Sequence, residues 1–151
     1  MAGIVAQGWA TPAGAARGTR YNPSMAQEKR YEIVVTTATK YLREQSDEPG
    51  DQFVFSYTVT IRNAGNANAQ LVSRHWIITD SHGKVQEVRG LGVVGAQPYL
   101  KPGETFEYTS GTAISTPVGT MRGSYQMVGE DGTRFDASIP EFTLSVPRTL
   151  H

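Results

Sequence analysis

The sequence contains no cysteine among its 151 residues. A disulfide framework, a thiolate metal site and a cysteine nucleophile are therefore all excluded. A chain without thiols suits a reducing compartment. We accordingly expect a cytoplasmic protein.

The chain also lacks net charge and long apolar runs. Fourteen Lys and Arg residues balance fourteen Asp and Glu residues, so the formal charge is zero. No electric field is available to attract nucleic acid or an anionic membrane. No apolar run reaches the roughly 18 residues of a membrane helix, and the N-terminus lacks the pattern of a secretory signal. We expect a soluble protein with neither nucleic acid nor membrane as a partner.

Helical periodicity is missing as well. Apolar residues nowhere persist at i, i+3, i+4 and i+7, whereas alternation with period two recurs along the chain and predicts strands. The predicted strands cover residues 31–41, 53–61, 71–80, 84–89, 105–110, 119–128, 134–139 and 142–146. Residues 43–52 and 90–103 are predicted to be loops because glycine and proline punctuate them.

Short strands joined by turns, without helical crossovers, predict antiparallel sheets. The favoured fold is an all-β, immunoglobulin or fibronectin type III-like sandwich of about seven strands, with a closed barrel as the alternative. Trp76 lies where such sandwiches bury a tryptophan, and alternation places Val72 and Ile78 on the same inner face. His75 is then expected on the outer face. Pro140 interrupts the last strand, so its C-terminal part is expected to lie on a sheet edge or to cross between sheets at a bulge.

The length predicts a single domain. Residues 1–27 are rich in Ala and Gly and carry no acid, so we expect a disordered N-terminal extension followed by one domain over residues 28–151. The extension faintly resembles a transit peptide. The interpretation we prefer is an upstream extension in front of a true start at Met25.

The segment Gly90-Leu91-Gly92-Val93-Val94-Gly95 matches the pattern G-x-G-x-x-G. A dinucleotide fold needs a helix after these glycines, and the two prolines that follow prevent one. A weaker hypothesis keeps Arg89, Gly90, Gly92 and Gly95 as a phosphate-binding loop, with backbone N–H groups forming a nest. The favoured interpretation is structural: the glycines permit positive φ and close chain approach, and Val93 and Val94 fill the end of the sandwich.

No catalytic residue and no metal site can be nominated. Asp80, His82 and Glu87 match no recognised ligand spacing, and the same holds for His151. Ser110 is not in a nucleophile elbow. The paired acids Asp47 and Glu48 lie in a loop and are typical of solvated charge. We therefore expect neither an enzyme nor a resident cofactor.

Long blocks of the sequence resemble one bacterial family. They are SRHWIITD (73–80), VQEVRGLGVVGAQP (85–98), KPGETFEYTSGT (101–112), PVGTMRGSYQMV (117–128) and RFDASIPEFTLSVPRTLH (134–151). From residue 31 to 151 the chain closely resembles the ApaG (CorD) family, whereas the first residues, up to about Gln27, depart from it. The resemblance implies a fibronectin type III-like sandwich and a non-enzymatic protein.

The resemblance also bears on partners. Family members are linked by name and gene neighbourhood to dinucleoside tetraphosphate metabolism and to cobalt and magnesium tolerance, and related eukaryotic domains resemble protein-binding modules. Two functions follow as hypotheses: a protein–protein interaction module that presents a loop or sheet edge to a protein partner, or a binder of nucleotide pyrophosphate through Arg89 and the glycine loop, with a divalent cation as a further component. Unpaired strand edges leave both monomer and homodimer open.

Overall fold

A computed structural model describes residues 3–6 and 28–147, with only the backbone of residues 3–6. The described part contains nine strands and one short 3₁₀ helix, and no α-helix. The strands are β1 (Gly3–Ala6), β2 (Ile33–Tyr41), β3 (Phe53–Asn63), β4 (Ala69–Asp80), β5 (Val85–Leu91), β6 (Tyr99–Leu100), β7 (Thr105–Ile114), β8 (Val118–Gly129) and β9 (Arg134–Ser145), and the 3₁₀ helix η3 is Arg43–Gln45. The predicted all-β fold is confirmed.

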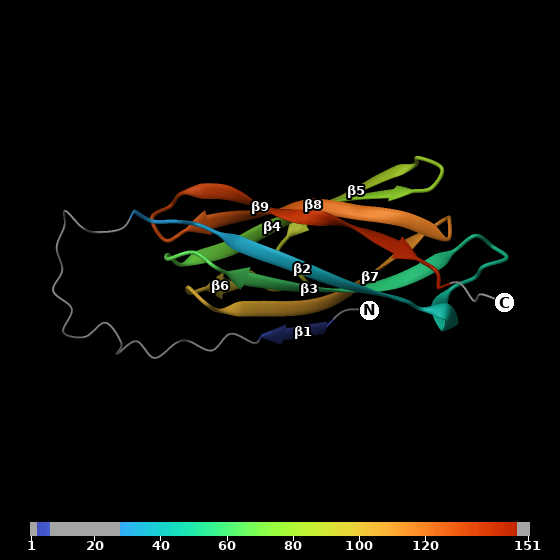
Figure 1. Cartoon of the computed structure of the whole chain (residues 1–151), viewed down its shortest axis with the longest axis horizontal. Helices are drawn as coiled ribbons and strands as arrows, with labels where there is room; N and C mark the ends of the chain where they lie inside the picture. Colours follow the sequence, from blue (N-terminus) through green and yellow to red (C-terminus); the bar gives the residue numbers. More distant parts are fainter. Residues whose placement is uncertain (1–2, 7–27, 148–151) are drawn as a thin grey trace.

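The strands form two antiparallel sheets stacked face to face (Figure 1). One sheet has the order β1-β7-β3-β2 and the other has the order β5-β4-β8-β9, with β6 pairing with β4 beside β5. The edge strands β2 and β9 contact each other along one side of the molecule. The architecture is therefore a sandwich, and the barrel alternative is wrong.

The core lies between the sheets and follows the period-two pattern of the sequence. In β3 every second side chain from Phe53 to Asn63 is buried, as alternation predicts for a strand with one face inward. Trp76 is buried as predicted, with its ring edge-on to those of Tyr57 and Phe142. Edge-to-face contacts of this kind add to the burial of the aromatic surface.

A β-bulge in β4 corrects the predicted face of Val72. The pairing of β4 with β8 shifts by one residue between Leu71 and Ser73. Leu71 and Trp76 are both buried although five positions separate them, so one residue between them breaks the alternation. Simple alternation predicted that Val72 shares the inner face of Trp76 and Ile78. That prediction is wrong, because Val72 lies before the break in alternation and is only half-buried.

Strand β9 also departs from the prediction. It runs without interruption from Arg134 to Ser145, although Pro140 was expected to break it. The register of β8 against β9 shifts between Met121 and Gly123, and Pro140 falls within that shift, where no ladder hydrogen bond is required. Of the two alternatives, the sheet edge is confirmed: β9 is the edge strand of its sheet, and it does not cross to the other sheet.

Two further strands were missed. Residues 3–6 form β1, within the segment predicted to be disordered, and pair with β7. Strand β6 lies within the predicted loop 90–103 and is only two residues long. Residues 7–27 and 148–151, which include Met25 and His151, lie outside the described residues. In the described part, no helix has the length and apolar character needed to cross a lipid bilayer.

Candidate functional site

The glycine segment begins inside a strand. Gly90 and Leu91 are the last residues of β5, and Gly90 is paired with Arg74 of β4. The loop proper starts at Gly92, which has φ +63°, and continues into a tight turn from Val93 to Ala96, where Val94 has φ +41° and Gly95 has φ +85°. No helix follows. The exclusion of a dinucleotide-binding fold is therefore confirmed.

Gly90 makes room for the side chain of Arg74. A Cβ atom built at Gly90 would lie 2.8 Å from Arg74 Nη1. The Arg74 guanidinium crosses this position and donates hydrogen bonds to the carbonyl oxygens of Leu91 (3.0 Å) and Gly92 (2.9 Å). Arg74 thereby holds the end of β5 through charge-assisted hydrogen bonds.

Gly92 is required for its backbone conformation and for close packing. A Cβ atom there would lie 2.4 Å from the carbonyl oxygen of Ala96, in addition to the positive φ. Val93 is fully buried, and Val94 packs against the core from a half-buried position. The structural interpretation of the glycine segment is thus supported by close contacts at Gly90 and Gly92 and by a positive φ at Gly92 and Gly95.

Two of the loop N–H groups already have backbone partners. The N–H of Gly92 donates to the carbonyl oxygen of Val72 at 2.8 Å, and the N–H of Val93 donates to that of Ala96, also at 2.8 Å. A nest needs successive N–H groups directed at the anion. Gly92 and Val93 cannot supply these donors without losing the hydrogen bonds that fix the turn.

Arg89 lies on the outer face of the sheet. It is paired with His75 of β4, whose neighbour Trp76 points inward, so His75 and Arg89 point outward. The side chain of Arg89 is 72% exposed, and its Nη2 lies 3.5 Å from Glu87 Oε1. The predicted site is divided at the end of β5: Arg89 and Gly90, together with Arg74, line the hollow described below, whereas Gly92 and Gly95 do not.

Glu87 connects this part of the surface. His75 Nε2 lies 2.6 Å from Glu87 Oε1. This hydrogen bond, assisted by the charges of Arg89 and Arg122, lowers the pKa of the Glu87 carboxyl. Of the three residues considered for metal binding, Glu87 thus pairs with His75, and Asp80 accepts hydrogen bonds from the N–H groups of His82 and Lys84 in the β4–β5 turn.

The outer face of the β5-β4-β8-β9 sheet is hollowed beside Arg89. A hollow of about 580 Å³ crosses all four strands. Its lining includes Ser73, His75, Arg89, Gly90, Leu91, Ser124, Gln126 and Asp136. A second hollow of about 370 Å³ adjoins it, because the two share Ser73, Gln126 and Asp136. We refer to the two together as the outer-face groove.

Hydrogen bonds order the floor of the outer-face groove. Ser73 Oγ lies 2.8 Å from Gln126 Oε1, and Gln126 Nε2 lies 2.9 Å from Ser124 Oγ. At the rim, Leu91 is 75% exposed, which exceeds every other exposed large hydrophobic residue of the described surface. The groove therefore combines a fixed polar row with an apolar side chain in solvent.

Sequence reasoning found Arg89 and Gly90 but missed the rest of the groove. Ser124, Gln126 and Asp136 lie more than thirty residues further along the chain, and they come beside Ser73 only because β8 pairs with β4 and β9 with β8. In β8, Ser124 and Gln126 alternate with the buried residues Tyr125 and Met127, so they point away from the core. Nothing in the sequence indicated which outward residues would be neighbours.

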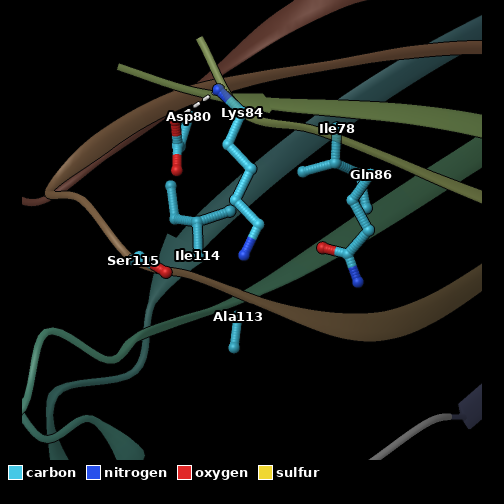
Figure 2. Close-up of a pocket in the computed structure, with 7 residues that line it drawn as sticks. All are labelled: Ile78, Asp80, Lys84, Gln86, Ala113, Ile114 and Ser115. Carbon is cyan, nitrogen blue, oxygen red and sulfur yellow. Dashed lines mark hydrogen bonds between the residues drawn. The ribbon is translucent and has the colours of Figure 1, made fainter. Parts of the chain in front are cut away.

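A different hollow opens between the sheets and is too small for a ligand. Figure 2 shows Lys84 and Gln86 of the β4–β5 hairpin pointing toward Ala113, Ile114 and Ser115. Its volume is about 40 Å³, which is room for about one water molecule. This small hollow lies between the two sheets, near Asp80.

No group of three or more His, Cys, Asp or Glu side chains within the described residues is arranged to hold a metal ion. Ser110 and Gly111 lie in the middle of strand β7, away from any strand-to-helix turn. The carboxylate of Asp47 accepts a hydrogen bond from the N–H of Gly50 within its own loop.

Comparison with known proteins gives a consistent result. The protein-family model described as the ApaG domain matches residues 43–129 of this chain. Proteins named ApaG are similar to the chain: one from Nitrosospira multiformis is 69% identical and one from Thiobacillus denitrificans is 64% identical, each over 84% of this chain and 100% of the relative.

Solved structures are similar as well. A crystal structure of a Bordetella pertussis protein that carries the name ApaA has a TM-score of 0.77 and 59% identity, covering 80% of this chain and 98% of that chain. A second X-ray structure has a TM-score of 0.75 and 48% identity, covering 80% of this chain and 91% of that chain.

Proposed function

This chain belongs to the ApaG family, and we propose that its β-sandwich is a non-enzymatic module that binds a protein partner through the outer-face groove. The observation that carries the proposal is the pair of adjoining hollows on one sheet with Leu91 exposed at the rim. The hollows offer room for side chains of a partner, and Leu91 offers an apolar contact beside them. The proposed compartment is the cytoplasm.

The groove suits a peptide segment better than a compact small molecule. It is open and extends across four strands, whereas small-molecule sites enclose most of the ligand surface. The row of Ser73, Gln126 and Ser124 offers hydroxyl and amide groups that can bond to a peptide backbone. Leu91 supplies an apolar contact at the rim of the groove.

Affinity capture with paired variants tests this proposal. Leu91→Asp places a charge at the rim, and Val34→Asp places one on an exposed hydrophobic residue of the opposite sheet as the matched control. Both sites are on the surface, so neither change should alter the free energy of unfolding by more than about 0.5 kcal/mol. We expect a specific partner to be captured by the wild type and by Val34→Asp, and lost with Leu91→Asp.

A partner retained equally by both variants, or lost only with Val34→Asp, would exclude the groove. Crosslinking provides a second measurement. A photoreactive residue at position 91 should crosslink the captured partner, and the same residue at position 34 should not.

The second candidate function is the binding of a nucleotide pyrophosphate in the same groove. The specific observation in its favour is that Arg89 and His75 line the hollow together with the hydroxyl groups of Ser73 and Ser124. Guanidinium and hydroxyl groups commonly donate hydrogen bonds to phosphate oxygens. This proposal moves the phosphate from the loop amides to the face of the sheet.

Titration with ADP or diadenosine tetraphosphate, with and without Mg²⁺, separates the two candidates. If the pyrophosphate proposal holds, amide shifts should cluster on Ser73, Arg89 and Ser124, and Arg89→Gln should weaken binding about tenfold or more, as expected for the loss of a charge-assisted contact. Amide shifts confined to residues 92–95 would show that the pyrophosphate binds to the glycine loop and not to the face of the sheet. No shifts at all would eliminate the pyrophosphate proposal and leave the peptide proposal untouched.

A further inference from the structure

The outer edge of β7 is occupied by a strand from the N-terminal segment. β1 pairs with it in antiparallel register, with Gly3 opposite Thr109, Ile4 opposite Tyr108, Val5 opposite Glu107 and Ala6 opposite Phe106. On its other side, β7 pairs with β3 along its full length. In Figure 1, β1 is the dark blue strand at the border of its sheet, beside β7.

β1 covers only part of that edge. It has four residues, whereas β7 has ten, from Thr105 to Ile114. The β7 residues from Ser110 to Ile114 extend beyond the register of β1. A strand edge presents a row of backbone N–H and C=O groups that can pair with another chain. A longer strand would therefore form more ladder hydrogen bonds with β7 than β1 does.

β1 is also weakly held on energetic grounds. Each ladder hydrogen bond contributes little net free energy, and ordering each residue of the added strand costs a comparable amount. For a four-residue strand, the free energy gained by pairing is therefore close to the free energy lost by ordering. Because the strand is attached to the rest of the chain, its effective concentration at β7 is on the order of millimolar, which favours pairing. Such a strand can be displaced by a competitor that pairs over a longer stretch.

We propose that the β7 edge is a binding site for an extended peptide strand of a partner protein. In the chain that begins at Met1, residues Gly3–Ala6 occupy this edge in the absence of that partner, whereas a chain that starts at Met25 leaves it open. This is recognition by strand addition, in which backbone hydrogen bonds supply affinity and alternate side chains supply specificity. The partner strand has at least eight residues. It carries apolar residues at every second position, opposite Phe106 and Tyr108, whose side chains are buried on the core side of the sheet.

The site is separate from the outer-face groove. β7 belongs to the β1-β7-β3-β2 sheet, and the groove lies on the outer face of the other sheet. Leu91→Asp therefore serves as a variant that disturbs the groove and leaves the β7 edge unchanged.

The test uses the full chain and a double substitution, Ile4→Pro and Val5→Pro. Successive N–H groups of a strand point to opposite edges, so replacing both residues removes whichever N–H faces β7, and neither proline fits a paired strand. The probe is a ten-residue synthetic peptide with valine at alternate positions and threonine between them. The control peptide has two central residues replaced by proline.

We expect the peptide to shift the amide signals of residues 105–114. It should bind the double variant about tenfold more tightly than the wild type, which is the factor expected when a resident strand closes the site in nine molecules of ten. Of the amides of residues 106–109, those that face β1 should also exchange hydrogen faster in the free double variant than in the wild type, whereas those that face β3 should not. Leu91→Asp should bind the peptide as the wild type does.

Three results would overturn the proposal. They are shifts located away from β7, a difference in affinity of less than about twofold between wild type and double variant, and equal binding of the proline-containing peptide. A concentration-dependent dimer of the double variant in place of peptide binding would show that a second copy of the chain takes the edge, and this too would overturn the commitment to a peptide.

Discussion

At the scale of single residues, the first two glycines of the G-x-G-x-x-G segment are explained by contacts within the fold, and Gly95 by its positive φ. Gly90 leaves space for the Arg74 guanidinium, and Gly92 combines a positive φ with close approach to the carbonyl of Ala96. The sequence pattern alone matched a phosphate-binding loop. Because Arg74 is sixteen residues earlier in the chain, only the pairing of β4 with β5 shows what Gly90 accommodates.

The contact between Gly90 and Arg74 can be tested by a double-mutant cycle. Gly90→Ala should lower the free energy of unfolding by about 1–3 kcal/mol, because a methyl group displaces the guanidinium from its two carbonyl partners. In an Arg74→Ala background the same change should cost at least about 1 kcal/mol less, since the displaced group is already gone. Urea unfolding of the four proteins measures both values. Equal costs in the two backgrounds would show that Arg74 is not what Gly90 accommodates.

At the scale of elements, the segment leading into β2 is anchored to the turn between β8 and β9. The ring of Tyr31 stacks on that of Phe135, with 5.1 Å between centroids, and lies where a Cβ atom of Gly129 would be. Tyr31 Oη donates a hydrogen bond to Asp131 Oδ1 at 2.5 Å. This hydrogen bond, together with those from Thr133, holds the pKa of Asp131 at about 2, below its ordinary value.

This anchor predicts a specific dependence on acid. Because the folded state lowers the pKa of Asp131, its contribution to stability is complete above the unfolded pKa of about 4 and is lost as the pH falls toward 2. We expect the urea midpoint to fall between pH 4 and pH 2, and to fall less in Asp131→Asn, which lacks the titrating group. Tyr31→Phe keeps the ring stack and should reduce the dependence in the same way.

Glu141→Gln, an exposed carboxyl on β9, is the control for this measurement and should follow the wild type. If Asp131→Asn and the wild type lose stability in parallel from pH 4 to pH 2, the hydrogen bond to Tyr31 does not contribute to the acid dependence.

At the scale of the whole molecule, the two sheets enclose a tyrosine cluster. Tyr57 and Tyr108 come from one sheet and Tyr125 from the other, and the hydroxyl groups of Tyr108 and Tyr125 lie 2.5 Å apart in the core. Burial raises the pKa of all three phenols above the ordinary value, because the charged phenolate is disfavoured away from water. The hydrogen bond between Tyr108 and Tyr125 connects the two sheets by a polar contact within the core.

The cluster predicts a loss of stability in alkali. A raised folded-state pKa means that above about pH 10 the unfolded chain releases protons that the folded chain retains, so the free energy of unfolding declines as the pH rises. Each buried phenol can contribute up to about 1.4 kcal/mol per pH unit. Tyr125→Phe should reduce the slope between pH 10 and pH 12, whereas Tyr99→Phe on the surface should not. Urea titrations at each pH measure the slope, and an unchanged slope in Tyr125→Phe would contradict the prediction.

The sequence by itself determined the fold class, the burial of Trp76 and the family. Strand alternation and turn residues are local properties, and a run such as Phe53 to Ile61 has only one face to bury, so these features follow from the chain read in order. Glycine and proline marked most turns correctly. The glycines and prolines of residues 90–103 also led to β6 being missed, because a two-residue strand depends on its pairing with β4 and not on local preference. Pro140 likewise suggested a break in β9, whereas the register shift against β8 accommodates the proline.

The tertiary structure alone decided which outward residues are neighbours. Alternation fixes the face of a side chain within its own strand, but the groove depends on register between β5, β4, β8 and β9, and a shift of one residue at Val72 changes that register. Strand β1 was missed although Ile4 and Val5 favour strands. A four-residue segment becomes a strand only where the fold supplies a partner, and that partner is the β7 edge.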